Sequence, residues 1–130
     1  MFTIDQIKAA HSKVKSGADF PGYVKEIATL GVTEYTYAVG DGSTTYYGAE
    51  NFSAASSPRY AQMTIADAGS IETLLKDLKI HQAGGSDFLT FCRQAAEAGV
   101  EKWTVNMNDM TCTYYDLAGN KMLTEAIPDA

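Results

Sequence analysis

The chain has 130 residues, 45% of them apolar and 20% charged, and this length and composition predict one globular domain with a buried core and exclude a disordered segment. The net charge is −6 and the ten lysine and arginine residues are scattered, which excludes the basic stripe that nucleic-acid binding requires. Because neither a secretory leader nor an apolar run of membrane-spanning length is present, we expect a cytoplasmic protein that does not bind a membrane.

The chain opens with two predicted helices. Thr3 and Gln6 have the spacing of a capping box, and apolar residues follow at helical steps. Gly17 then breaks the chain, and Asp19 is placed to cap the second helix. Gly31 ends that helix, because glycine adopts left-handed backbone without a Cβ clash.

Three strands are expected after these helices. Alternation of apolar and polar residues from residue 34 predicts a strand that is covered on one face. The sequence Gly40-Asp41-Gly42-Ser43 predicts a tight hairpin turn that returns through residues 45–47. We expect the third strand at about residues 59–66, after a small and polar stretch from Gly48 to Pro58. Extended loops of this kind often carry function.

The second half repeats this order of elements. Ser70 is placed to begin a helix, and Gly84-Gly85 break the chain. Asp87 is placed to cap the next helix, which Gly99 ends. Alternation around Trp103 then predicts another strand that is covered on one face.

Two further strands complete the second half. The turn at residues 108–111 lacks glycine, so we expect a longer hairpin loop here than in the first half. The chain then returns through residues 113–115. A short turn at residues 117–120 leads into a last strand at residues 121–127.

An internal duplication accounts for this repetition. Residues 17–47 and 85–115 align without a gap at an offset of 68, and 11 of the 31 positions are identical, where unrelated segments would share about two. The identical pairs are Gly17/Gly85, Asp19/Asp87, Phe20/Phe88, Ala28/Ala96, Gly31/Gly99, Val32/Val100, Thr36/Thr104, Asp41/Asp109, Thr45/Thr113, Tyr46/Tyr114 and Tyr47/Tyr115.

The duplication predicts the architecture. We expect one α+β domain, residues 1–130, made of two repeats of about residues 1–68 and 69–130. Each repeat has two helices and a three-stranded meander, and a pseudo-two-fold axis relates the two. Four helices then pack on a mainly antiparallel sheet, and the pattern leaves open whether the halves share one sheet or stack two.

Aromatic residues of the strands are the candidate binding site. Adjacent tyrosines on a strand point to opposite faces, so one ring of each pair enters the core and the other lies on the open face. Duplication would then place aromatic walls with phenolic tips around a groove, whereas the alternative is simple cross-strand packing. The candidate residues are Tyr35, Tyr46, Tyr47, Trp103, Tyr114 and Tyr115.

The titratable residues predict no catalytic set. Asp41 and Asp109 could supply a carboxylate pair for acid–base chemistry, but aspartate is also a preferred turn residue. His11 and His81 have no second ligand at metal-binding spacing, so neither a metal nor a cofactor is expected. Cys92 lies on an apolar helix stripe, which favours a buried, reduced packing residue over a nucleophile.

Other residues carry weaker signals. The second cysteine, Cys112, is also expected to be reduced, because two cysteines are too few for a disulfide framework. Gly84-Gly85 before a helix could cradle an anion, but the carboxylate of Asp87 would occupy that position.

The chain resembles a known family. A Gly-x-Asp-Phe helix start, a Gly-Val helix exit and the strands Trp103-Thr104-Val105, Thr113-Tyr114-Tyr115-Asp116 and Glu125-Ala126-Ile127-Pro128 are similar to the YdfO-like family of small bacterial and prophage-borne domains. Such proteins often carry the label of phage envelope protein. The resemblance implies a single domain and transfers no catalytic residue.

Our leading hypothesis is a homodimeric, non-enzymatic module that binds a small molecule or a protein through the open aromatic face or the stretch from Gly48 to Pro58. One alternative is an acidic, prophage-associated regulator that occupies the basic site of a partner protein. Another is an enzyme that uses carboxylates and tyrosines in a cleft between the halves. Its candidate groups are Asp41, Asp109, Tyr46, Tyr114 and Glu125.

Overall fold

The structure is a computed structural model, and it describes residues 2–14 and 19–127. Gly17, which is predicted to separate the first two helices, lies outside these ranges.

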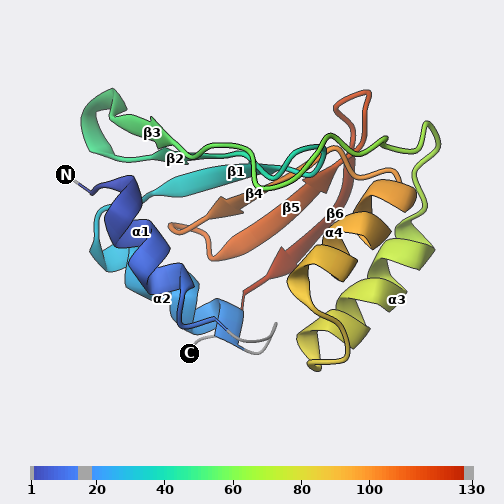
Figure 1. The fold of residues 1–130 in the computed structure, drawn as a ribbon, viewed down its shortest axis with the longest axis horizontal. Helices are drawn as coiled ribbons and strands as arrows, with labels where there is room; N and C mark the ends of the chain where they lie inside the picture. The colour runs from blue at the N-terminus through green and yellow to red at the C-terminus, as the bar shows by residue number, and fades with distance from the viewer. Residues whose placement is uncertain (1, 15–18, 128–130) are drawn as a thin grey trace.

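The elements of the first half are two helices and three strands (Figure 1). Helices α1 and α2 are followed by strands β1 and β2, a short 3-10 turn η2, and strand β3. Their bounds are α1 Ile4–His11, α2 Phe20–Thr29, β1 Glu34–Ala38, β2 Thr44–Tyr47, η2 Ala49–Asn51 and β3 Ser53–Ala55.

The second half has the same order of helices and strands. Helices α3 and α4 precede strands β4, β5 and β6. Their bounds are α3 Ile71–Gln82, α4 Phe88–Glu97, β4 Lys102–Asn106, β5 Thr111–Tyr115 and β6 Lys121–Ala126.

One antiparallel sheet joins the two halves. The strand order is β3-β2-β1-β4-β5-β6, so β1 and β4 form the seam between the halves. This confirms the predicted α+β class with four helices in the described residues, and it resolves the open question in favour of a single sheet. Figure 1 shows α1 and α2 together at one end of the sheet and α3 and α4 together at the other.

Most of the predicted helix caps are present in the structure. Thr3 and Gln6 form the predicted capping box. Ser70 and Asp87 cap α3 and α4, and the Asp87 carboxylate accepts the Thr90 amide proton at 2.7 Å. Asp19 is the exception, because it stands at the N-cap position of α2 in helical backbone without a capping hydrogen bond from its side chain to that helix.

The third strand of the first half differs from the prediction. It lies at Ser53–Ala55 and pairs with β2, whereas residues 59–66 have no regular structure. The 3-10 turn explains the difference, since it reverses the chain immediately after β2. Residues 59–63 hydrogen-bond to the β1–β2 turn instead, through backbone carbonyls of Gly40 and Asp41.

The second hairpin also departs from the prediction. Four residues join β4 to β5, from 107 to 110, whereas five join β1 to β2, from 39 to 43, so the expected longer loop is wrong. The side chain of Asn106 accepts the amide protons of Asn108 and Asp109 at 2.9 and 3.0 Å. Met110 takes the left-handed backbone, at φ +52°, that glycine provides in the first hairpin.

The register at the seam is the one that two repeats related by a dyad predict. Thr36 of β1 faces Thr104 of β4, which is its own counterpart at the offset of 68, and their hydroxyl groups lie 3.1 Å apart. Because β1 and β4 are antiparallel, residue numbers rise along β1 and fall along β4. A residue of β1 therefore faces its own counterpart at a single position, which is where the pseudo-two-fold axis would cross the sheet. The duplication itself stays a prediction.

A row of threonines crosses the open face of the sheet at this position. It spans five neighbouring strands and consists of Thr45, Thr36, Thr104, Thr113 and Thr124. Cross-strand threonine pairs of this kind stabilise a sheet. The opposite face carries the apolar residues of the strands, and both helix pairs pack against it.

Candidate functional site

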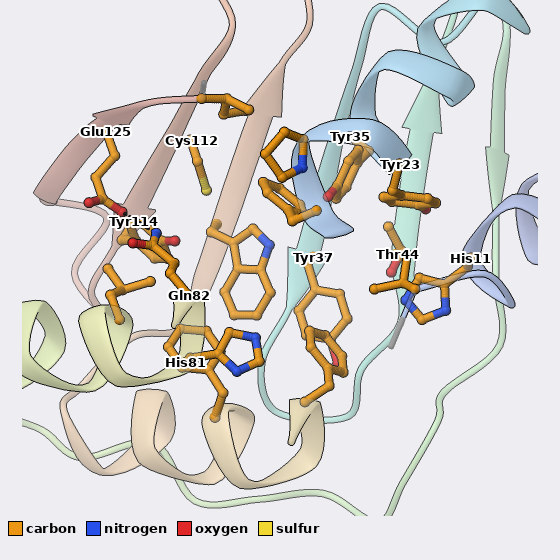
Figure 2. Close-up of a pocket in the computed structure, with 18 of the residues that line it drawn as sticks. His11, Tyr23, Tyr35, Tyr37, Thr44, His81, Gln82, Cys112, Tyr114 and Glu125 are labelled. Atoms are coloured by element: carbon orange, nitrogen blue, oxygen red, sulfur yellow. Dashed lines mark hydrogen bonds between the residues drawn. The ribbon is translucent and has the colours of Figure 1, made fainter. Parts of the chain in front are cut away.

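A cavity of about 490 Å³ lies on the covered face of the sheet, between the two helix pairs (Figure 2). This volume falls in the range of small-molecule sites in proteins. Strands β1, β2, β4, β5 and β6 and all four helices supply most of the lining, and Val14, Arg59 and Ile127 supply the rest from segments outside these elements. The cavity therefore collects side chains from both halves of the chain.

The lining divides by its origin in the sequence. We call the residues numbered up to 68 the N-terminal wall: His11, Val14, Phe20, Pro21, Tyr23, Tyr35, Tyr37, Thr44, Tyr46 and Arg59. We call the remainder the C-terminal wall: Leu78, His81, Gln82, Phe88, Phe91, Trp103, Cys112, Tyr114, Glu125, Ala126 and Ile127. In Figure 2, Tyr23, Thr44 and His11 lie on one side of the view, opposite Cys112 and Glu125.

Aromatic rings pack against one another in the middle of the cavity. The rings of Tyr37 and Trp103 stack, with centroids 4.4 Å apart and planes at 12°. Phe88 packs edge-on against both rings. His81 stacks on Phe91 with centroids 4.6 Å apart. Packed rings present flat apolar surfaces, so this part of the cavity suits a planar ligand.

The six predicted site residues divide between the two faces of the sheet. Tyr35, Tyr46, Trp103 and Tyr114 are buried and line the cavity. Tyr47, which is 40% exposed, and Tyr115 do not line it, because each follows a lining tyrosine on its strand and so points to the open face. Strands β1 and β4 separate Tyr47 from Tyr115, so these two rings form no common groove on the open face. The aromatic lining of the cavity therefore lies on the covered face of the sheet.

The hydroxyl groups of Tyr23, Tyr35 and Tyr114 stay protonated at neutral pH. Burial raises the pKa of Tyr35 and of Tyr114 well above its ordinary value. Burial also raises the pKa of Tyr23, and the neighbouring Tyr46 raises it further. Each of these phenols can therefore donate a hydrogen bond to a ligand.

The two histidines of the cavity are neutral at pH 7. Burial lowers the pKa of His11, and the charge of Arg59 lowers it further. Burial also lowers the pKa of His81, although the hydrogen bond between its Nδ1 and the Ser86 carbonyl, 3.1 Å long, opposes this shift. The charged side chains of the lining are therefore Arg59 on one wall and Glu125 on the other.

Thr44 has a buried polar atom that its surroundings leave unpaired. The residue is 2% exposed, and its hydroxyl oxygen has no hydrogen-bond partner in the part of the chain that the structure describes. Leaving a buried hydroxyl unpaired costs about 1–3 kcal/mol. Unpaired buried groups are rare in folded proteins and often mark positions where a ligand or water binds.

The cavity holds no arrangement typical of nucleophilic catalysis among the described residues. Burial raises the pKa of Cys112 to about 12 and also raises that of Cys92, so both thiols are protonated at neutral pH. Both cysteines are free and buried, as expected. In the described ranges no three histidine, cysteine, aspartate or glutamate side chains come together as a metal site.

The predicted carboxylate pair is not part of the cavity. The carboxylate of Asp41 accepts hydrogen bonds from the amide and hydroxyl of Ser43, and these bonds lower its pKa. Asp41 is therefore a turn residue. Asp109 lies exposed in the other hairpin turn. Of the groups proposed for an enzyme, Tyr46, Tyr114 and Glu125 line the cavity.

Several lining residues were not among the predicted site residues. Thr44 and Cys112 each lie two positions before a predicted tyrosine, so the same alternation could have found them. Phe88 and Phe91 are on the apolar stripe of α4 that the sequence shows. Arg59 carries no such signal, because it lies in a segment without regular structure.

A second hollow adjoins the first. It has a volume of about 530 Å³ and lies between α1 and residues 56–59. His11, Tyr46 and Arg59 line both spaces, so they form the boundary between them.

These features define a small α+β domain in which two helix pairs and one sheet enclose an aromatic cavity. The chain belongs to the family described as "Protein of unknown function (DUF1398)", which matches residues 8–126. No curated protein matches the chain significantly. In the described ranges, every helix is too short or too polar to cross a bilayer.

Proposed function

We propose that this domain is a non-enzymatic module that binds a small molecule in the cavity between its helix pairs. One observation carries the proposal: the hydroxyl of Thr44 is buried and unpaired on the wall of a cavity of ligand size. A ligand that accepts or donates a hydrogen bond there would offset the free energy that folding loses at this position.

The burial of the lining favours a small molecule over a protein partner. Tyr35 is 5% exposed and Tyr46 is 2% exposed. A flat protein surface does not reach side chains at this depth, whereas a compact molecule between the helix pairs would contact them.

Trp103 gives a direct readout of binding, because it is the single tryptophan of the chain and lines the cavity. The experiment titrates the protein with a panel of neutral, anionic and cationic aromatic compounds while recording Trp103 emission and the melting temperature. A ligand at 100 times its Kd should add about 2.7 kcal/mol of stability. If no compound changes either signal, the proposal is wrong.

A pair of threonine variants localises the binding. Thr44→Val keeps the shape of the side chain and removes the unpaired hydroxyl, so it should weaken the ligand by about 5- to 10-fold. Thr36→Val is the matched control, since its hydroxyl pairs with Thr104 on the open face. Equal affinity in the wild type and both variants would contradict a site at Thr44.

The finer assignments made from the sequence remain part of this proposal. The YdfO-like resemblance and the prophage association stay predictions. A cytoplasmic location, a homodimer, a protein partner and the acidic-regulator alternative stay predictions. Size-exclusion chromatography with light scattering would test the dimer.

A further inference from the structure

We infer that the molecule this cavity accepts is a planar aromatic carboxylic acid, with its carboxylate on the N-terminal wall and its ring system on the C-terminal wall. The inference rests on the proposed function and specifies the chemical class of the ligand. It follows from the unequal distribution of donors, charges and rings around the cavity.

The N-terminal wall is rich in hydrogen-bond donors. It carries five hydroxyl side chains, those of Tyr23, Tyr35, Tyr37, Thr44 and Tyr46, whereas Tyr114 is the hydroxyl side chain of the C-terminal wall. Tyr37 is already engaged, since its hydroxyl lies 3.1 Å from that of Tyr60 and 3.4 Å from the Cys92 sulfur. The hydroxyl groups of Tyr23 and Tyr46 interact with each other, which leaves one of their two protons free to donate. Together with the hydroxyl groups of Tyr35 and Thr44, this pair suits an acceptor such as a carboxylate.

Arg59 adds a positive charge to the same wall. Its guanidinium forms no ion pair with a described carboxylate within 4.0 Å, and the side chain borders both hollows. Its charge reaches His11 and Tyr23, where it favours the deprotonated form of each side chain. An arginine can hold a carboxylate through two parallel hydrogen bonds, so it would be the strongest single contact for an acid.

The C-terminal wall offers flat apolar surfaces instead. Phe88, Phe91 and Trp103 lie close together there, with ring centroids 5.8 Å apart for Phe91 and Trp103 and 6.3 Å apart for Phe88 and Trp103. Rings in such an arrangement bind another ring by stacking and edge contacts.

Glu125 fixes the orientation of the acid. It lies on β6, and three strands separate β6 from β2, which carries Thr44. At the usual strand spacing this is about 19 Å across the sheet. A carboxylate beside Glu125 would be repelled, whereas one at the Arg59 end would be far from that charge. Glu125 also accepts a hydrogen bond from Gln82 at 3.4 Å.

Three probes of one shape test the inference: biphenyl-4-carboxylate, the neutral biphenyl-4-carboxamide and the cationic biphenyl-4-ylmethylamine. Quenching of Trp103 emission on excitation near 300 nm gives Kd for each probe. We expect the carboxylate to bind at least about tenfold more tightly than the amide, and the amine to bind most weakly, because a charge-assisted hydrogen bond exceeds a neutral one.

Arginine variants then locate the charge. Arg59→Gln should weaken the carboxylate by about 10- to 100-fold and leave the amide within about twofold. Arg93→Gln is the matched control, because Arg93 on α4 is exposed, as Arg59 is, but does not line the cavity. It removes the same charge and should leave both affinities unchanged.

The outcomes separate this inference from the proposed function. If the amide or the amine binds as tightly as the carboxylate, or if Arg59→Gln weakens the carboxylate no more than Arg93→Gln does, the carboxylate assignment is wrong and the binding function stands. If none of the three probes alters Trp103 emission or the melting temperature, the inference is wrong. The proposed function falls as well only if the wider panel of aromatic compounds also leaves both signals unchanged.

Discussion

The two walls of the cavity occupy equivalent positions in the two halves of the chain, yet they differ in chemistry. At the offset of 68, Tyr23 corresponds to Phe91, Tyr35 to Trp103 and Thr44 to Cys112, and all six residues line the cavity. In each pair the first member carries a hydroxyl group and the second does not. Similar positions in the fold thus supply polar contacts on one wall and apolar contacts on the other.

This difference shows how two similar halves can build an asymmetric site. Two identical walls would favour a symmetric ligand, or two copies of one ligand. Because the counterparts of Tyr23, Tyr35 and Thr44 carry no hydroxyl group, the N-terminal wall has more hydrogen-bond donors than the C-terminal wall. Arg59 and Glu125 strengthen the contrast, because they place opposite charges on the two walls.

The largest expected effect compares the glycines that end α2 and α4. Gly31 and Gly99 both have positive φ, +110° and +86°. A Cβ on Gly99 would lie 2.6 Å from the Cα of Gly69, whereas the nearest atom to a Cβ on Gly31 is 3.9 Å away. Gly99→Ala should therefore lower the free energy of unfolding by about 2–5 kcal/mol and Gly31→Ala by about 1–2 kcal/mol. Urea denaturation measures both, and equal losses would contradict this packing difference.

The next effect concerns the stability of the two threonine variants in the absence of ligand. Thr44→Val should raise the free energy of unfolding by about 1 kcal/mol, because it removes an unpaired buried hydroxyl. Thr36→Val should lower it by about 1 kcal/mol, because it removes a paired one. If chemical denaturation shows a gain of stability in Thr44→Val and a loss in Thr36→Val, the Thr44 hydroxyl destabilises the ligand-free protein, as expected for a group that binds a ligand. A loss in both variants would contradict it.

A smaller effect separates the two faces of the sheet. Tyr35→Phe removes a buried hydroxyl from the N-terminal wall and should weaken biphenyl-4-carboxylate by about 3- to 10-fold. Tyr47→Phe makes the same change on the open face and should leave the affinity unchanged. An effect at Tyr47 as large as that at Tyr35 would move the site to the open face.

The smallest effect is a pH dependence of stability. Burial lowers the folded-state pKa of His11 and of His81, so the unfolded chain binds more protons as the pH falls through 6.5. This part of the stability is fully present above pH 6.5 and is lost as the pH falls toward the folded-state pKa values. Denaturation at pH 7.5 and pH 5.5 should show the loss. The double variant His11→Gln/His81→Gln should reduce it, and an unchanged slope in that variant would contradict the account.

Local signals predicted the helices and most of the strands because each acts on its own neighbourhood. The capping pair Thr3 and Gln6, the cap Asp87 and the glycine exits at residues 31 and 99 all fix a helix end within a few residues. The third strand of the first half was misplaced because the small and polar stretch from Gly48 to Pro58 was interpreted as a loop, whereas Ser53–Ala55 within it forms the strand and residues 59–66 do not. Their backbone bonds instead go to the β1–β2 turn, which no local pattern indicates.

The site was only partly predictable for a related reason. Alternation correctly separated Tyr46 from Tyr47, but it could not show which face the helices cover or that the helix pairs leave a space between them. Arg59 joins the site through an irregular segment, and the unpaired hydroxyl of Thr44 is a property of its packed surroundings. Both depend on tertiary contacts.

The most direct test of a cavity shared between the two halves is a ¹H–¹⁵N correlation spectrum recorded with and without biphenyl-4-carboxylate. Trp103 contributes the single indole N–H resonance, and the amides of Thr44 and Cys112 report on the two walls. We predict that all three resonances shift with one common Kd while those of Tyr47 and Tyr115 do not. Shifts confined to Tyr47, Tyr115 and the threonine row would contradict the account.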